Sequence, residues 1–203
     1  DRLPAFMAAL RGRAPSPSSR ALEFLILTAA RSGEVRGATW DEIDLERGLW
    51  TIPAARMKAG REHRVPLPDA VVALLKATLP VAGTELIWPG QDMRKPMSDM
   101  SVAALVKKMH AADLAVGGEG WLDPKLGRPA VPHGFRSTFR DWAAEATTYP
   151  NEMAEIALAH DVGSAVERAY RRGDQLEKRR AMMDDWAAHA LSAFCAGLRA
   201  VGQ

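Results

Sequence analysis

Residues 132–142, PHGFRSTFRDW, place three side chains that can bind an anion on one face of a predicted helix. His133, Arg136 and Arg140 recur at helical spacing, and the start of a helix attracts anions through its unpaired N–H groups. The planar guanidinium group can also hold two phosphate oxygens at once. Four other residues occupy a different, apolar face and are expected in the core: Phe135, Phe139, Trp142 and Ala143. The segment is therefore either a phosphate-binding face or a polar surface that begins with a histidine.

Arg31 directly follows the most apolar stretch of the chain, residues 20–30. An arginine at the edge of a core needs an acceptor or an anion, because burying an unpaired charge is costly. Glu34 lies three residues later and can supply that partner as a structural ion pair. Alternatively, Glu34 braces Arg31 while its guanidinium faces a ligand phosphate.

Lys58 lies in a basic segment, RMKAGREHRVPL, beside the glycine of a predicted turn. Such a lysine is usually solvated, but a lysine on a flexible hairpin can also deliver a proton to a leaving oxygen. Basic clusters of this kind are either solvated surface or contacts for a polyanion. The candidate contacts for such a polyanion are Arg56, Arg61, Arg64, Arg140, Arg171 and Arg172.

Two further candidates follow near the end of the chain. His160 lies at a predicted helix end, where the dipole favours a charged imidazole, although a histidine there is more often a cap. Tyr170 is one of two tyrosines and has Arg168, Arg171 and Arg172 as neighbours. A tyrosine at helical spacing is ordinarily a half-buried core residue. Basic neighbours would instead help its phenol, with an ordinary pKa of about 10, to act as a nucleophile.

The composition indicates one sizeable domain, with 203 residues of which 47% are hydrophobic. A single cysteine, Cys195, excludes a disulfide framework within the chain and indicates a reducing compartment. No apolar run approaches the roughly 18 residues of a membrane span. The chain starts without Met and without a signal-peptide pattern, so we expect a fragment of a longer protein that works in the cytoplasm.

The predicted elements give a mainly α protein with a small antiparallel β-sheet, an α+β arrangement. Residues 49–52 and 63–67 form the predicted strands, with Gly60 at the turn between them. Ser18 or Ser19 is expected to cap the buried helix 20–30, and Gly37 to close a short helical turn. Further helices are predicted from residue 69 and over residues 98–112, 133–146, 151–159, 164–172 and 176–198.

In chain order, the candidates resemble the active-site series of the tyrosine recombinase and integrase family: Arg31, Lys58, His133, Arg136, His160 and Tyr170. Five motifs carry the resemblance: TAARSGEVRGATWDEID, RMKAGREHRVPL, PHGFRSTFRDW, LAH and VERAY. The residues in these motifs are most similar to those of the prophage integrases of genomic islands. The resemblance covers residues 21–188 and implies the catalytic-domain fold of DNA breaking-rejoining enzymes.

The resemblance also implies a role for each residue. Tyr170 would attack a phosphodiester and form a 3′-phosphotyrosine, while Arg31 and Arg136 hold the phosphate oxygens and Glu34 supports them. Lys58 would be the general acid for the leaving 5′ oxygen and His133 the general base. His160 would hydrogen-bond the phosphate. No metal or other cofactor is expected, because the two arginines neutralise the charge. Residue 159 is Ala where the family commonly has Gly, and because both are small we expect a modest effect on His160.

The implied partners are double-stranded DNA attachment sites, which the protein would bind as a homotetramer. Without DNA it would be a monomer or a weak oligomer. An accessory DNA-bending protein is a further implied partner. Residues 1–203 are expected to form a single catalytic domain with its core at about residues 18–175. The DNA-binding domains that precede the catalytic domain in this family are expected to be missing. The final helix, at about residues 176–200, packs either in cis or on a neighbouring protomer.

Three other functions remain open from the sequence. A non-cleaving remnant of an integrase would keep the fold and the basic site. An enzyme similar to type IB topoisomerases would use the same chemistry but release supercoils without strand exchange. A metallohydrolase would use His133 and His160 as metal ligands, although neither lies in a typical ligand motif.

Overall fold

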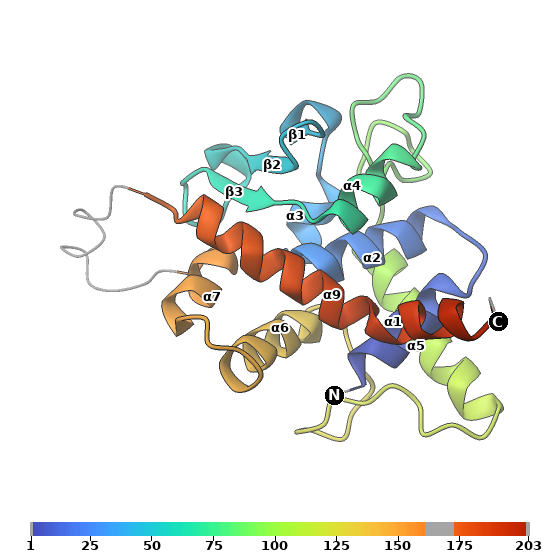
Figure 1. Cartoon of the computed structure of the whole chain (residues 1–203). Helices are drawn as coiled ribbons and strands as arrows, with labels where there is room; N and C mark the ends of the chain where they lie inside the picture. Colours follow the sequence, from blue (N-terminus) through green and yellow to red (C-terminus); the bar gives the residue numbers. More distant parts are fainter. Residues whose placement is uncertain (1, 161–172, 202–203) are drawn as a thin grey trace.

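The computed structural model describes residues 2–160 and 173–201, with residues 194–201 described by their backbone, and it is mainly helical (Figure 1). A three-stranded antiparallel sheet is inserted between the third and fourth helices. The helices are α1 Leu3–Arg11, α2 Pro17–Thr28, α3 Ser32–Arg36, α4 Asp69–Lys76, α5 Asp99–Ala115, α6 Gly134–Glu145, α7 Asn151–Ala157 and α9 Leu176–Val201. The strands are β1 Ile43–Asp44, β2 Leu49–Ile52 and β3 His63–Pro66, with short 3-10 turns at Trp40–Glu42 and Ala54–Arg56. The α+β arrangement predicted from the sequence is confirmed.

Helix α2 is buried almost all round, as its composition predicts. Its N-cap is Ser16, one turn earlier than expected. The Ser16 side chain accepts a hydrogen bond from the backbone N–H of Ser19, and the Ser19 side chain accepts one from the backbone N–H of Ser16. The expectation that Ser18 or Ser19 is the cap was therefore wrong. This reciprocal capping box starts the helix at Pro17, whose missing N–H costs nothing in the first turn.

Helix α9 crosses the molecule and packs on α1, α2 and β3, with the sheet on one side and α6 on the other (Figure 1). Trp186 is fully buried, and its indole N–H donates to the carbonyl of Ile26 in α2 at 2.8 Å. Burying each large apolar side chain contributes about 1.5–3 kcal/mol. The other buried apolar residues of α9 are Met182, Met183, Ala187, Ala190 and Leu191. Of the two arrangements left open by the sequence, this part of the final helix therefore adopts packing in cis.

The hydrophobic core is also wider than the predicted residues 18–175. Helix α1 was not predicted, yet Leu3, Phe6, Met7 and Leu10 are all buried in the same core as α9. The Phe6 ring contacts Trp121 edge-on and Phe135 at a tilt. The N-terminal segment is thus part of the domain core and supports the base of α6.

The sheet follows the predicted pattern. Ile52 pairs with His63 and Leu49 with Pro66, so the connection over residues 53–62 projects from the end of the β2–β3 hairpin. Gly60 lies in this connection with a φ of 61°, a conformation that glycine adopts without strain. Trp50 of β2 packs its ring 5.1 Å from that of Phe24, which attaches the sheet to α2.

The predicted apolar face of α6 is buried, from Phe135 through Phe139 and Trp142 to Ala143. Phe139 and Trp142 contact Trp186 of α9 with ring centroids 5.3 and 5.2 Å apart. This packing holds the opposite, polar face of α6 toward the ends of α2 and α7. No helix in the described part of the chain is both long and apolar enough to cross a bilayer.

Candidate active site

Arg31 lies where the chain turns from α2 into α3. Its Nη1 donates to Glu34 Oε1 at 2.8 Å, and its backbone N–H donates to Glu34 Oε2 at 2.8 Å. The Nη2 atom reaches across to the carbonyl of Ala159 at 3.3 Å. The Arg31 side chain is 29% exposed and that of Glu34 only 7%. The ion pair considered from the sequence exists, and it leaves Arg31 accessible to a ligand.

Arg136 is buried on the first turn of α6, with only 5% of its surface exposed. Its Nη1 donates to the carbonyl of Ala29 and its Nη2 to the carbonyl of Leu158, both at 2.6 Å. Burial, followed by the positive charge of Arg31, lowers the pKa of Arg136 to about 10. Two guanidinium groups from segments 105 positions apart in the sequence are thus held close enough to repel each other.

The two arginines brace each other's turns. Arg136 donates to the carbonyl of Ala29, two residues before Arg31 in the chain. Arg31 donates to the carbonyl of Ala159, the residue before His160. Both alanines have a φ of 50°, in the left-handed region that disfavours side chains. A modest effect of Ala159 is expected from its size, but its backbone conformation matters as well. Each strained turn directs a carbonyl at an arginine.

His160 joins this group at the end of α7. Its Nε2 accepts a hydrogen bond from Arg136 Nη2 at 3.3 Å, and its Nδ1 lies 2.6 Å from Glu155 Oε2. The other Glu155 oxygen binds Arg140 Nε at 2.6 Å. Partial burial alone would raise the pKa of Glu155, but the hydrogen bond with His160 and the charge of Arg140 outweigh it and lower that pKa.

Sequence reasoning missed Glu155. The available signal was a carboxylate five residues before His160. That signal is informative only once α7 is known to end in a turn that brings residue 160 back over residue 155, with the His160 N–H bonded to the Glu155 carbonyl at 2.9 Å.

The remaining predicted site residues lie elsewhere. Lys58 is exposed in the β2–β3 connection, and His133 is exposed at the N-cap position of α6, three residues before Arg136. Tyr170, Arg171 and Arg172 lie outside the described residues, as does the predicted helix 164–172. The structure therefore brings together Arg31, Glu34, Arg136 and His160, with His133 on the same helix as Arg136.

Arg56 was expected to contact DNA, and the structure holds its side chain within the fold. Its side chain forms an ion pair with Glu42 and donates to the backbone carbonyl of Glu34. Both acceptors belong to the fold, and the Glu42 side chain is only 6% exposed. Arg56 therefore has a structural role, in which it attaches the β2–β3 connection to α3.

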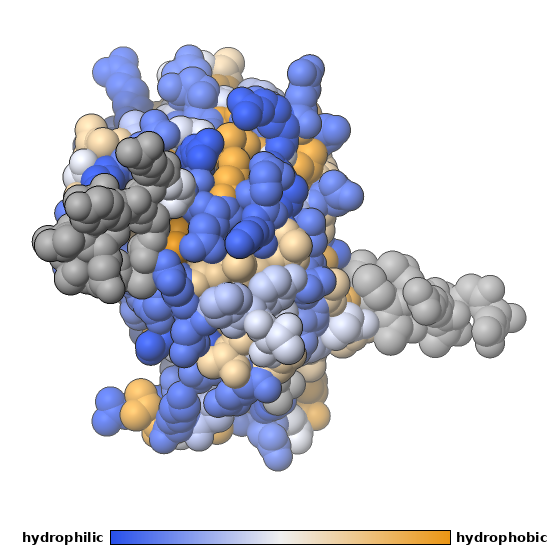
Figure 2. Space-filling model, turned by 60° about the vertical axis from the view of Figure 1, so that its left-hand side comes forward, coloured by the Kyte–Doolittle hydropathy of each residue, from blue (hydrophilic) through white to orange (hydrophobic). Residues whose placement is uncertain are grey.

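The other described basic candidates differ in how they are held. Arg64 donates two hydrogen bonds to Asp174, which also receives one from the buried Arg179 at the start of α9. Arg140 pairs with Glu155, and Arg61 is exposed beside the turn. The sheet and α7 lie on one side of the molecule, and the described surface there is dominated by hydrophilic residues (Figures 1 and 2).

His63 is a second residue whose importance was not expected. It begins β3, is half-buried, and its Nε2 donates to the carbonyl of Ala157 at 3.2 Å. Burial, followed by the positive charge of Arg179, lowers its pKa to about 4. The neutral imidazole thus connects the hairpin that carries Lys58 to the end of the helix that carries His160.

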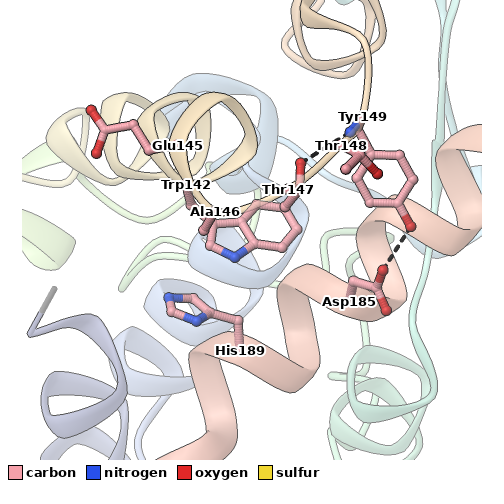
Figure 3. A pocket seen from close by; sticks show the side chains of 8 residues that line it. All are labelled: Trp142, Glu145, Ala146, Thr147, Thr148, Tyr149, Asp185 and His189. Carbon is pink, nitrogen blue, oxygen red and sulfur yellow. Dashed lines mark hydrogen bonds between the residues drawn. The ribbon is translucent and has the colours of Figure 1, made fainter.

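Tyr149, the other tyrosine, lies in a different environment (Figure 3). It lines an open pocket of about 760 Å³ between the end of α6 and α9, together with Trp142, Asp185 and His189. Its hydroxyl donates to Asp185 Oδ2 at 2.7 Å, and this bond raises the pKa of Tyr149 to about 12. A phenol held in this way is a poor nucleophile, and none of the candidate site residues that the structure describes lines the pocket.

The metallohydrolase alternative has no site in residues 2–160 and 173–201, because no three His, Cys, Asp or Glu side chains there are placed to share a metal ion. Both ring nitrogens of His160 also have other partners.

Comparison with solved structures places the fold. The integrase from mycobacterium phage Brujita superposes with a TM-score of 0.62 at 19% identity, over 87% of this chain and 54% of that one. A lambda integrase dimer bound to a COC′ core site gives 0.54 at 22% identity, over 83% of this chain and 45% of that one. At this level of identity the likeness concerns the fold, and it confirms the tyrosine recombinase catalytic-domain fold expected from the motifs.

Sequence comparison identifies the family. Prophage integrase IntA of Escherichia coli K12 is 38% identical over 190 residues, covering 92% of this chain and 42% of the relative. Prophage integrase IntZ of the same organism is 34% identical, covering 97% and 45%. The integrase of Enterobacteria phage P4 is 33% identical, covering 92% and 43%, so the chain spans less than half the length of these relatives. Residues 1–177 match the phage integrase family, and the chain belongs to that family.

Proposed function

We propose that the protein to which this chain belongs is a site-specific DNA recombinase that integrates and excises a prophage or genomic island. In this proposal the chain is the catalytic domain, and it cleaves DNA through a 3′-phosphotyrosine at Tyr170. Membership of the phage integrase family and the integrase relatives support this function.

The observation that carries the proposal is the pair of arginines. Arg31 and Arg136 are held by the carbonyls of Ala159, Ala29 and Leu158, and their mutual repulsion contributes to the lowered pKa of Arg136. Two neighbouring cations at strained turns destabilise a fold, so we interpret the arrangement as one that an anionic ligand stabilises. A phosphate group would do so, because it adds negative charge where both guanidinium groups lie. The same arrangement would favour the more highly charged pentacoordinate transition state.

The chemistry then needs three further groups. The Tyr170 oxygen forms a bond to phosphorus while the bond from phosphorus to the 5′ oxygen breaks. His133 takes the phenol proton, and Lys58 gives a proton to the leaving 5′ oxygen. His160 hydrogen-bonds a phosphate oxygen. Both Lys58 and His133 are exposed, so incoming DNA can reach them. The reverse reaction with a new 5′ hydroxyl rejoins the strands.

The proposed partners are double-stranded attachment sites, bound by a tetramer that pairs two duplexes, with an accessory protein that bends the DNA. Solved relatives support DNA as the partner, since one is a lambda integrase dimer bound to a core site and another a XerH recombinase bound to its difH substrate. We expect the parent protein to act on the bacterial nucleoid. We retain Arg61, Arg64, Arg140, Arg171 and Arg172 as candidate DNA contacts.

The test is covalent capture on a nicked suicide substrate by the parent protein. Wild type should form a protein–DNA adduct that survives denaturant, and Tyr170→Phe should form none. Tyr149→Phe is the matched control, because Tyr149 is the other tyrosine and its hydroxyl is bound to Asp185. No adduct from wild type would favour a non-cleaving remnant. If the protein forms adducts and relaxes supercoiled DNA but does not exchange strands, the topoisomerase-like alternative would be favoured.

A further inference from the structure

Glu155 is the carboxylate in contact with both His160 and Arg140. One of its oxygens lies 2.6 Å from His160 Nδ1 and the other 2.6 Å from Arg140 Nε. Its side chain is 23% exposed, whereas that of Arg140 is 61% exposed. Glu155 is therefore held between a group of the candidate active site and a more exposed arginine one turn after Arg136.

The neighbours of His160 select one protonation pattern of its ring. A guanidinium can only donate, so the contact between Arg136 Nη2 and His160 Nε2 requires a lone pair on Nε2. An ionised carboxylate can only accept, so the contact with Glu155 requires a proton on Nδ1. Two independent contacts thus select the same tautomer, with the proton on Nδ1. Arg136 Nη2 also donates to Leu158, and these two acceptors use both of its N–H bonds.

We infer that Glu155 is a positioning residue that orients His160 for the phosphate by holding its Nδ1 proton. Without Glu155, the ring could turn or move its proton to Nε2, where it would oppose the N–H of Arg136. With Glu155 in place, Nε2 stays directed at the arginine pair, where a phosphate would bind. To donate to a phosphate oxygen, Nε2 must take up a proton from solvent when DNA binds, while Glu155 keeps the other ring proton on Nδ1. Carboxylates that orient a functional histidine through its second nitrogen work in this way in many sites. The inference rests on the proposed function, since it concerns how that site handles phosphate.

Arg140 has a secondary part in this arrangement. Its ion pair draws one Glu155 oxygen away from the ring and leaves the other for Nδ1. Because Arg140 is largely exposed, its ion pair contributes little to stability. Arg140, expected from the sequence to contact DNA, thus also bears on the active site through Glu155.

The first arm of the test reads the tautomer directly in the chain without DNA. Nitrogen NMR of ¹⁵N-histidine-labelled protein should show His160 protonated on Nδ1, with the signal assigned by its loss in His160→Gln. Glu155→Ala should abolish this preference, and Glu155→Gln, whose amide oxygen still accepts from Nδ1, should restore most of it. An unchanged tautomer in Glu155→Ala overturns the inference.

The second arm measures single-turnover adduct formation by the parent protein. Glu155→Ala should slow adduct formation by about 10-fold to 100-fold, the usual effect of removing a carboxylate behind a functional histidine, with Glu155→Gln in between. Glu145→Gln, an exposed carboxylate at the end of α6, should react at the wild-type rate. If Glu155→Ala forms the adduct at the normal rate, or if Glu145→Gln slows adduct formation equally, the role of Glu155 is overturned while the proposed function stands. A wild-type parent that forms no adduct overturns the proposed function and this role with it.

Discussion

The fold should lose stability as the pH falls from 6.5 toward 4, because His63 is kept neutral in the folded protein. Its Nε2 donates to the carbonyl of Ala157, and burial with the nearby charge of Arg179 lowers its pKa to about 4 from an ordinary 6.5. Below pH 6.5 the unfolded chain therefore binds a proton that the folded chain does not. The contribution of neutral His63 is complete above pH 6.5 and is lost as the pH approaches 4.

The size of the effect follows from the same two pKa values. At about 1.36 kcal/mol per pH unit, the interval between them corresponds to a loss of about 3 kcal/mol in the free energy of unfolding, most of it present by pH 4.5. This is an upper limit, because His63 is only half-buried. Urea denaturation of wild type and His63→Gln at pH 7.5 and pH 4.5 would measure it. Glutamine is the matched substitution, because its amide can donate to Ala157 and does not titrate.

Wild type should lose about 2 kcal/mol more than His63→Gln between these two pH values. The comparison removes the other titrating groups: burial also lowers the pKa of His189, and the pKa values of Glu155 and Asp174 are lowered too, but all three occur in both proteins. Equal losses in the two proteins would refute the argument, and would mean that His63 is solvated and does not attach β3 to α7.

Three other predictions concern the site and its supports. Ala159→Gly should raise the free energy of unfolding by up to about 1 kcal/mol in urea denaturation, because residue 159 has a φ of 50°, whereas Ala112→Gly in α5 should lower it by about 0.5–1 kcal/mol. Arg31→Ala and Arg136→Ala should each reduce single-turnover cleavage by about 10²-fold to 10³-fold. Both should also lower the melting temperature, because Arg136→Ala leaves the carbonyls of Ala29 and Leu158 without that donor and Arg31→Ala leaves the buried carboxylate of Glu34 without its cation. Arg56→Ala should destabilise the fold yet leave the salt dependence of DNA binding unchanged, whereas Arg61→Ala should reduce its slope by about one, as measured by titration at several salt concentrations.

Much of the fold was predictable because local patterns decide it. Strand β2 falls on the predicted residues 49–52, since a run of β-branched and aromatic residues between turn signals favours a strand. The buried face of α6 follows from the spacing of Phe135, Phe139 and Trp142. Helix α1 was not predicted, although Leu3, Phe6, Met7 and Leu10 recur at helical spacing, because a short pattern at a chain end forms a stable helix only when the rest of the core buries it.

The sequence alone determined the family and predicted the site residues, because the order and spacing of Arg31, Lys58, His133, Arg136, His160 and Tyr170 are local features. Tertiary structure alone decided what these side chains touch. The partners of Arg136 lie 107 and 22 positions away, and the acceptors of Arg56 lie 14 and 22 positions away.

The same reason explains the final helix and Glu155. The apolar stripe of α9 fits a cis or a trans partner equally well, and only the position of the core, with Ile26 accepting from Trp186, decides for cis packing of residues 182–191. In the sequence, nothing separates Glu155 from an ordinary surface carboxylate. Only the turn after α7 brings His160 into contact with it. Spacing along a chain fixes which residues share a face, whereas contacts between distant segments depend on how the whole core packs.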